Sequence, residues 1–205
     1  MRTLTDLACH LNFRGRRRKP GVRSPLAFVT DYERLPDPLP IAAHLPAGSL
    51  VIFRHYEAPD RKSQARQLAK LCRSRRLCLL IAGDFDLVVS LGSGLHLPET
   101  LARQASPRLR LWHRNRGHLM TVAAHGRYAL VRAARQGANA ALLSPVFPTL
   151  SHPGQPCLGL LAFRNLVRLA ALDVYALGGV SCKTITGLIG SGAVGVATVS
   201  GFEKT

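Results

Sequence analysis

The sequence predicts an α/β fold, a single compact (β/α)8 TIM barrel preceded by a basic N-terminal arm. The chain has 205 residues, enough to bury one core, and 47% of them are apolar, too many for a disordered protein. Eight short apolar runs alternate with helix-like segments along the chain. Strands that alternate with helices form βαβ units, and eight such units favour closure into a barrel. A doubly wound open sheet is the alternative for the same pattern.

The predicted strands are short and almost continuously apolar, which is typical of parallel strands covered on both faces. No run approaches the roughly 18 apolar residues that a membrane-spanning helix needs, so no membrane span is expected. In chain order the strands are expected at residues 26–30, 50–54, 77–81, 94–97, 119–123, 140–144, 174–177 and 194–199.

Helical periodicity is clearest over residues 61–73, where four apolar residues from Ala65 to Cys72 fall on one stripe. A second helix is expected over residues 127–136, because a glycine follows as a C-cap signal. A third is expected over residues 181–189, with a serine N-cap at its start and a glycine after its end.

The first 24 residues carry seven basic residues and one acid. The arginine run at residues 16–18 has no apolar periodicity, so residues 1–24 are predicted to be a solvated, flexible arm and residues 25–205 the barrel. The formal net charge of the whole chain is +17, and most of the remaining bases lie on predicted helices. No aromatic side chains interleave with the basic runs, as a stacking platform would require, so nucleic acid is not expected as a partner.

The five cysteines include no CxxC pair and no Cys/His spacing typical of a structural zinc site. Their odd number also disfavours a disulfide framework, and a reducing compartment fits. The apolar segment from residue 4 to residue 11 is too short and polar for the core of a secretory leader. Together these features predict a cytoplasmic protein.

In a (β/α)8 barrel the chemistry lies where strands end and the following loops begin. Gly178 and Gly179 follow the seventh predicted strand, where small residues let the backbone approach an anion. The helix predicted behind them would offer free N–H groups. Ser200 follows the eighth strand, and the loops after the last two strands commonly bind phosphate in such barrels. We therefore predict a phosphate site here; a tight turn that needs small residues is the alternative.

Titratable and hydroxyl side chains follow the fifth and sixth strands. His125 comes after the fifth strand, and its imidazole could move protons near neutral pH. The long loop after the sixth strand carries Thr149, Ser151 and His152, whose polar atoms can bind phosphate or carboxylate oxygens. The alternatives are a histidine that caps the next helix and a rigid proline-rich turn.

Residues 26–202 resemble the thiamine phosphate synthase and TenI (thiazole tautomerase) family. The most specific part is residues 144–159, which are similar to the family's GPxFxTxTK loop and the helix start behind it. Residues 176–180 look like the family's AIGGI, residues 192–200 like GADGVAVVS and residues 94–97 like GVHL. As an ordered set these motifs are more specific than any one of them alone.

The resemblance implies a (β/α)8 barrel that binds a thiazole phosphate in thiamine biosynthesis. In the synthase, the thiazole hydroxyl displaces pyrophosphate from a hydroxymethylpyrimidine diphosphate with Mg²⁺. The tautomerase branch instead aromatises a thiazole phosphate carboxylate by proton transfer without a metal. The positions of this chain that match the family's substrate and phosphate-binding positions are Arg54, Thr149, Ser151, His152, Gly178, Gly179, Val199 and Ser200.

The positions of the synthase's Mg²⁺ carboxylates are changed in this chain. Where the synthase has Asn-Asp after the third strand, this chain has Ala82-Gly83. Where the synthase has GQED after the fourth strand, this chain has residues 98–101, Pro-Glu-Thr-Leu. Asp84 and Glu99 are therefore the candidate metal ligands, in a shifted register.

The cationic partners for a diphosphate are also fewer, because Tyr56 and His152 stand where the synthase has lysines. His125 matches the histidine of the family's GVSxH motif after strand five. A phosphate site with a titratable histidine suits proton transfer better than metal-assisted displacement. We therefore predict a tautomerase-like enzyme with His125 as its catalytic residue and no required cofactor. The alternatives are an active synthase with rearranged Mg²⁺ ligands and a non-catalytic module that binds a phosphorylated ligand; a homodimer is compatible with each.

Overall fold

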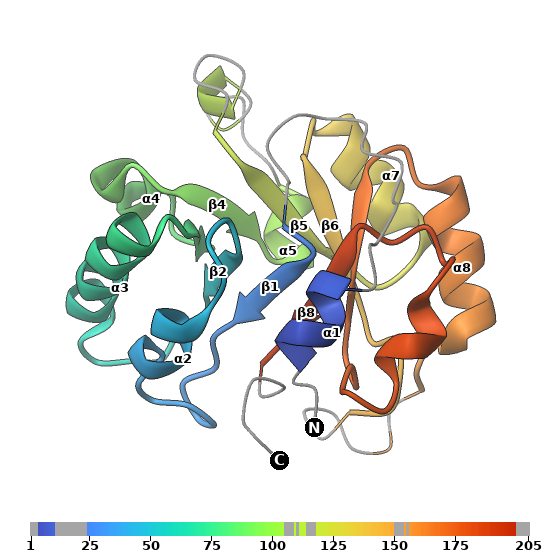
Figure 1. The fold of residues 1–205 in the computed structure, drawn as a ribbon. Coiled ribbons are helices and arrows are strands. Elements are labelled where there is room, and N and C mark those ends of the chain that lie inside the picture. The colour runs from blue at the N-terminus through green and yellow to red at the C-terminus, as the bar shows by residue number, and fades with distance from the viewer. Residues whose placement is uncertain are drawn as a thin grey trace.

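The computed structural model describes residues 4–10, 24–104, 109, 111–113, 118–149, 154 and 156–199. Its centre is a closed parallel barrel in which β1 pairs with β8 as well as with β2 (Figure 1). The strands are β1 (Leu26–Val29), β2 (Leu50–Phe53), β3 (Cys78–Ala82), β4 (Gly94–Leu97), β5 (Met120–Ala124), β6 (Ala140–Leu143), β7 (Asp173–Leu177) and β8 (Gly195–Thr198). The barrel prediction is confirmed, and the open-sheet alternative is wrong because the two outer strands are hydrogen-bonded to each other.

Alternate residues of each strand point into the barrel and out toward the helices. In β2, Leu50 and Ile52 belong to the apolar cluster inside the barrel, whereas Val51 and Phe53 belong to the cluster under the helices. Burial on both faces explains why the strands read as continuous apolar runs. The same alternation places Arg54, directly after β2, in the inward row at the mouth.

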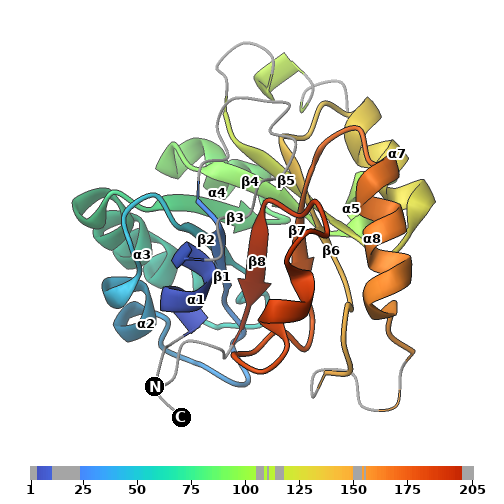
Figure 2. The ribbon, with the colours of Figure 1, turned by 45° about the vertical axis from the view of Figure 1, so that its right-hand side comes forward.

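Helices cover the outside of the barrel (Figure 2). The longest, α3 (Arg61–Arg75), buries the predicted stripe from Ala65 to Cys72. Among the described residues, no helix is long and apolar enough to cross a membrane. The other helices that follow strands are α2 (Leu39–His44), α4 (Phe85–Leu91), α5 (Glu99–Ala102), α7 (Arg127–Arg135) and α8 (Gly159–Leu169).

The helix predicted over residues 181–189 was wrong. The structure has only a short 3-10 turn there, η1 (Ile185–Leu188). The Thr184 hydroxyl donates to the Gly179 carbonyl at 2.9 Å and accepts from the Ser181 N–H at 2.9 Å. Ser181 is therefore not a helix cap, and hydrogen bonds of this local kind compete with helix formation. The free N–H groups of a helix are consequently not available behind the two glycines.

Residues 4–10 form a helix, α1 (Leu4–His10), where the sequence predicted part of a flexible arm. Leu4 and Ala8 are buried in the outer apolar cluster, and α1 contacts β1 and η1. Both views show α1 beside β1 and β8 (Figures 1 and 2). The structure describes only Val199 after β8, and therefore no helix that follows this strand. On this side of the barrel the covering helix is α1. Residues 11–23, with most of the predicted arm, lie outside the described residues.

The cysteines whose side chains the structure describes form no disulfide bond. Burial raises the pKa of the Cys72 thiol to about 12. A thiol with so high a pKa stays protonated and is a poor nucleophile. Cys72 therefore serves as a packing residue on the buried face of α3.

His96 is a buried titratable group inside the barrel. Its side chain is in the inward row of β4, is 3% exposed, and places Nδ1 2.9 Å from the Thr121 hydroxyl. Burial, together with the nearby Arg54 guanidinium, lowers the pKa of His96 to about 3. The folded protein therefore keeps His96 neutral well below neutral pH.

We expect His96 to make the protein less stable in mild acid. The unfolded chain binds a proton near pH 6.5, but the folded chain binds it only near pH 3. The contribution of neutral His96 is thus complete above pH 6.5 and is lost as the pH falls toward 3, with a slope that approaches about 1.4 kcal/mol per pH unit. Denaturant unfolding at a series of pH values measures this slope. His96→Gln should flatten it, and an equal slope in both proteins would contradict the prediction.

Candidate functional site

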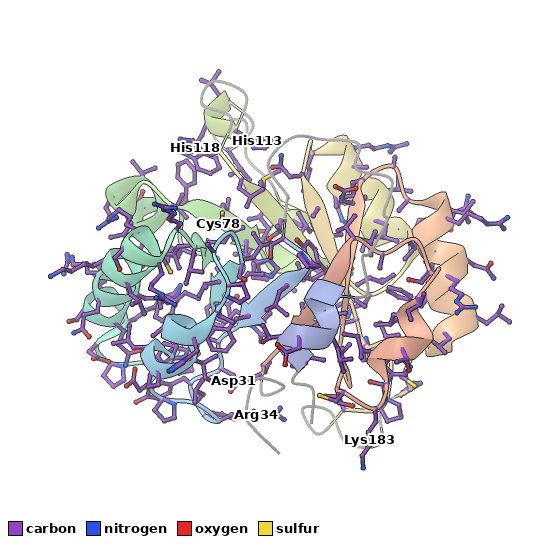
Figure 3. The ribbon with its side chains drawn as sticks, viewed as in Figure 1. Asp31, Arg34, Cys78, His113, His118 and Lys183 are labelled. Carbon is purple, nitrogen blue, oxygen red and sulfur yellow. The ribbon has the colours of Figure 1, made fainter. Side chains whose placement is uncertain are left out.

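The predicted site residues that the structure describes lie at one end of the barrel. In Figure 3, Asp31, which follows β1, and Lys183, in the loop after β7, lie toward the same end, while His113 and His118, which precede β5, lie toward the opposite end. The end marked by Asp31 is the C-terminal edge of the strands, where barrel chemistry is located. The described site residues in the loops of that edge are Arg54, Asp84, Glu99, His125, Thr149, Gly178, Gly179 and Val199.

His125 directly follows β5 and continues the inward row of Thr121 and Ala123. Its Nδ1 lies 2.9 Å from the carbonyl oxygen of Ser144, the residue after β6. A carbonyl oxygen can only accept, so Nδ1 carries the hydrogen and the lone pair of the neutral ring is on Nε2. The residue is exposed and lies at the C-terminal edge of the barrel.

Gly178 and Gly179 form a loop that only glycine fits. Both have positive φ, 92° and 65°. A Cβ on Gly178 would lie 2.8 Å from the Pro145 Cα, and a Cβ on Gly179 would lie 2.7 Å from the Phe147 Cβ. The Phe147 N–H donates to the Gly178 carbonyl at 3.1 Å. The loops after β6 and β7 are therefore packed together. The loop after β6 begins at Ser144, whose carbonyl oxygen accepts from the His125 ring.

The glycine loop presents successive backbone N–H groups. No hydrogen bond from the Gly179 or Val180 N–H to another described residue is formed, whereas the Ser181 N–H is bound by the Thr184 hydroxyl. Consecutive N–H groups in a glycine turn form a concave nest that favours an anion. The N–H groups predicted to hold an anion therefore belong to the loop itself and not to the helix that the sequence predicted.

Arg54 is a half-buried cation in the inward row of the mouth. Its N–H donates to the Thr30 hydroxyl at 2.9 Å, which fixes the backbone at the end of β2. Its charge contributes to the lowered pKa of His96, whose side chain is in the inward row of β4. Arg54 forms no ion pair with any carboxylate in the described part of the chain. Such a guanidinium is suited to a phosphate or carboxylate of a ligand.

The two candidate metal ligands have other partners. Asp84 caps α4, with Oδ1 accepting from the Leu87 N–H at 2.9 Å. Glu99 Oε1 accepts from Arg103 at 3.3 Å and from Arg132 at 3.4 Å. Each carboxylate therefore already has partners within the protein: Asp84 binds the start of α4, and Glu99 binds two arginines.

Gly83 and Leu101 stand where the synthase has its Mg²⁺ carboxylates. Together with Tyr56 and Pro98 they form an apolar corner of the mouth. A Cβ added to Gly83 would lie 3.3 Å from Tyr56 Cε1, 3.4 Å from Leu101 Cδ1 and 3.8 Å from Pro98 Cγ. Across the described ranges, no three His, Cys, Asp or Glu side chains come together as a metal-binding group. Mg²⁺ prefers hard oxygen ligands, so these residues do not fit a Mg²⁺-diphosphate complex.

Three of the predicted substrate residues cannot be placed. Ser151 and His152, in the loop after β6, and Ser200, after β8, lie outside the described residues. Thr149 is half-buried in the loop after β6, and Val199 is half-buried directly after β8. Their proposed contacts with a ligand remain predictions.

Sequence reasoning missed the way in which Glu99 is used. Glu99 Oε2 lies 3.2 Å from the backbone nitrogen of His125 and accepts its N–H. The one sequence signal was the spacing of Glu99 and Arg103, four residues apart, which is typical of a pair on a helix surface. The bond to His125 spans 26 residues and had no such signal.

The family profile described as thiamine monophosphate synthase (TMP-TENI) matches residues 26–202. A protein of Aquifex aeolicus provisionally named thiamine-phosphate synthase 2 is 30% identical over 156 residues, covering 75% of this chain and 82% of its own. The thiamine-phosphate synthase of Bacillus licheniformis is 24% identical over 178 residues, covering 82% of this chain and 78% of its own.

Among solved structures, a thiamine phosphate pyrophosphorylase from Pyrococcus furiosus superposes with a TM-score of 0.67. Its sequence is 18% identical, and the match covers 85% of each chain. At this identity the likeness supports the barrel fold alone.

Proposed function

This chain belongs to the thiamine monophosphate synthase (TMP-TENI) family, and on that premise we propose that it isomerises a thiazole phosphate by proton transfer through His125. The observation that carries the proposal is the orientation of the ring. The 2.9 Å bond from Nδ1 to the Ser144 carbonyl leaves a basic Nε2 at the mouth. The glycine loop after β7 is the proposed phosphate site, and Arg54 is the proposed partner of a second anionic group of the ligand.

The proposed reaction is a shift of one proton within the ligand. The lone pair of Nε2 takes a proton from the thiazole ring system, and the electron pair of the broken bond moves into the ring. The imidazolium then returns the proton to a second ligand atom, and His125 ends neutral as it began. The Ser144 carbonyl stabilises the intermediate cation, because a hydrogen bond strengthens when its donor is charged. A histidine suits both steps because an imidazole can accept a proton at one nitrogen and later give it up.

The second candidate function is thiamine phosphate synthesis with rearranged Mg²⁺ ligands. The name of the Bacillus licheniformis relative favours it. The apolar corner around Gly83 disfavours it, because a Mg²⁺-diphosphate complex would meet Tyr56 and Leu101 there. A barrel that binds a phosphorylated ligand without turnover is the third candidate.

One pair of assays separates these candidates. We expect the full chain to convert a thiazole phosphate carboxylate to its aromatic isomer in D₂O, followed by proton NMR as deuterium is incorporated. With hydroxymethylpyrimidine diphosphate, thiazole phosphate and Mg²⁺, we expect no thiamine phosphate. Formation of thiamine phosphate that is lost in Asp84→Asn would overturn the isomerase proposal. Tight binding with turnover in neither assay would instead favour the binding module.

A further inference from the structure

The carboxylate of Glu99 joins three elements of the mouth. Glu99 is the first residue of α5. Its Oε1 accepts from Arg103, the residue that follows α5, and from Arg132 on α7. Its other oxygen, Oε2, accepts the backbone N–H of His125 at 3.2 Å. The Glu99 side chain is only 18% exposed. Of its bonds, the one to Arg132 is partly buried, whereas those to Arg103 and to the His125 N–H are exposed.

The two arginines are not equivalent partners. The Arg103 side chain is 64% exposed and its ion pair is weakened by solvent, whereas the Arg132 side chain is 31% exposed. The Nε of Arg132 is buried with no acceptor among the described residues. Glu99 therefore neutralises a partly buried guanidinium with one oxygen and keeps the other for His125.

His125 needs such bonds because packing restrains it little. The residue is exposed, and a Cβ added to Gly126 would meet nothing within 4 Å. Its backbone is tied to the β4 side through Glu99, and its ring is tied to the β6 side through the Ser144 carbonyl. The two bonds hold the residue between the neighbouring strands on either side of β5.

We propose that Glu99 is a positioning residue for His125, acting through its bond to the backbone N–H and not as a metal ligand. This inference rests on the proposed role of His125. Removing the carboxylate would leave the His125 N–H to water and the Arg132 cation without its partner. The imidazole would then sample orientations in which Nδ1 no longer meets the Ser144 carbonyl. A displaced general base loses rate more than affinity, because the phosphate contacts lie on other loops.

The test compares Glu99→Ala, Glu99→Gln and a matched control in the full-length protein. Asp37→Ala is the control, because Asp37 also accepts one backbone N–H, from Leu39 at 3.0 Å, but lies in the loop before α2. We expect Glu99→Ala to lower kcat by about 100-fold with KM changed by less than about threefold. Glu99→Gln keeps an oxygen acceptor and should recover most of kcat, and Asp37→Ala should match the wild type.

A second readout does not depend on turnover. The ¹⁵N chemical shifts of the His125 imidazole report which ring nitrogen carries the hydrogen. They should indicate the Nδ1–H form in the wild type and in Asp37→Ala, and a mixture of the two forms in Glu99→Ala. If the wild type isomerises nothing, the proposed function fails, and these shifts alone decide the positioning role. Shifts in Glu99→Ala that match the wild type would overturn it, as would an unchanged kcat in an active enzyme.

Discussion

Replacing His125 by alanine is expected to lower kcat for isomerisation by about 100-fold to 10,000-fold, the range typical of a lost general acid–base group. The imidazole is exposed, so its removal leaves no cavity and little change in the free energy of unfolding. Affinity for the phosphorylated ligand should also change little, because the proposed phosphate site lies on the loop after β7. Steady-state kinetics with proton NMR detection measures the loss.

His44 offers a matched control for this substitution. It is exposed like His125, and its Nδ1 lies 2.7 Å from the Pro40 carbonyl, so its ring donates to a carbonyl in the same way. It ends α2, outside the mouth. His44→Ala should therefore keep full activity. Equal rates for His125→Ala and the wild type would show that the proton is moved by another group.

Gly179→Ala is expected to disrupt the proposed phosphate site. At φ 65° an added Cβ would lie 2.7 Å from the Phe147 Cβ and would also press on the Pro148 carbonyl, so the loops after β6 and β7 must separate. We expect affinity for inorganic phosphate to fall at least about tenfold and the free energy of unfolding to fall by roughly 1–3 kcal/mol. Calorimetric titration and denaturant unfolding measure the two effects.

Gly48→Ala separates backbone strain from the steric contact. Gly48 has a φ of 86°, but an added Cβ there would meet nothing within 4 Å. It lies in the turn before β2, at the end of the barrel opposite the mouth. This substitution should reduce stability by about 1 kcal/mol through strain alone and leave phosphate binding intact. If Gly179→Ala bound phosphate as well as Gly48→Ala does, the proposed site would be in the wrong place.

The strands could be predicted because their signal is local. Each observed strand boundary lies within one residue of the predicted one, since every strand is an apolar run bounded by polar or glycine residues.

The helix predicted over residues 181–189 is absent from the structure for a reason that was partly visible in the sequence. Thr184, Ile185 and Thr186 are β-branched, and Gly187 follows them directly. What was not visible is that Leu160 of α8 packs 3.0 Å from where a Cβ on Gly187 would lie.

The missed helix α1 has a different cause. Residues 1–24 are dominated by charge, and the short segment from Leu4 to His10 has too few apolar residues to stand out. Its stability comes from burying Leu4 and Ala8 against the barrel. Short helices draw most of their stability from such contacts, so sequence pattern alone underestimates them.

The sequence by itself determined the barrel, the edge that carries the polar residues, and the glycines of the loop after β7. These follow from periodicity and from residue types that act through their own backbone. Only the tertiary structure decided which nitrogen of His125 is free and what Glu99 does. His125 meets Ser144 across 19 residues and Glu99 across 26. Partners so distant in the chain are brought together by the pairing of β5 with β4 and β6, which sets the loops after these strands side by side.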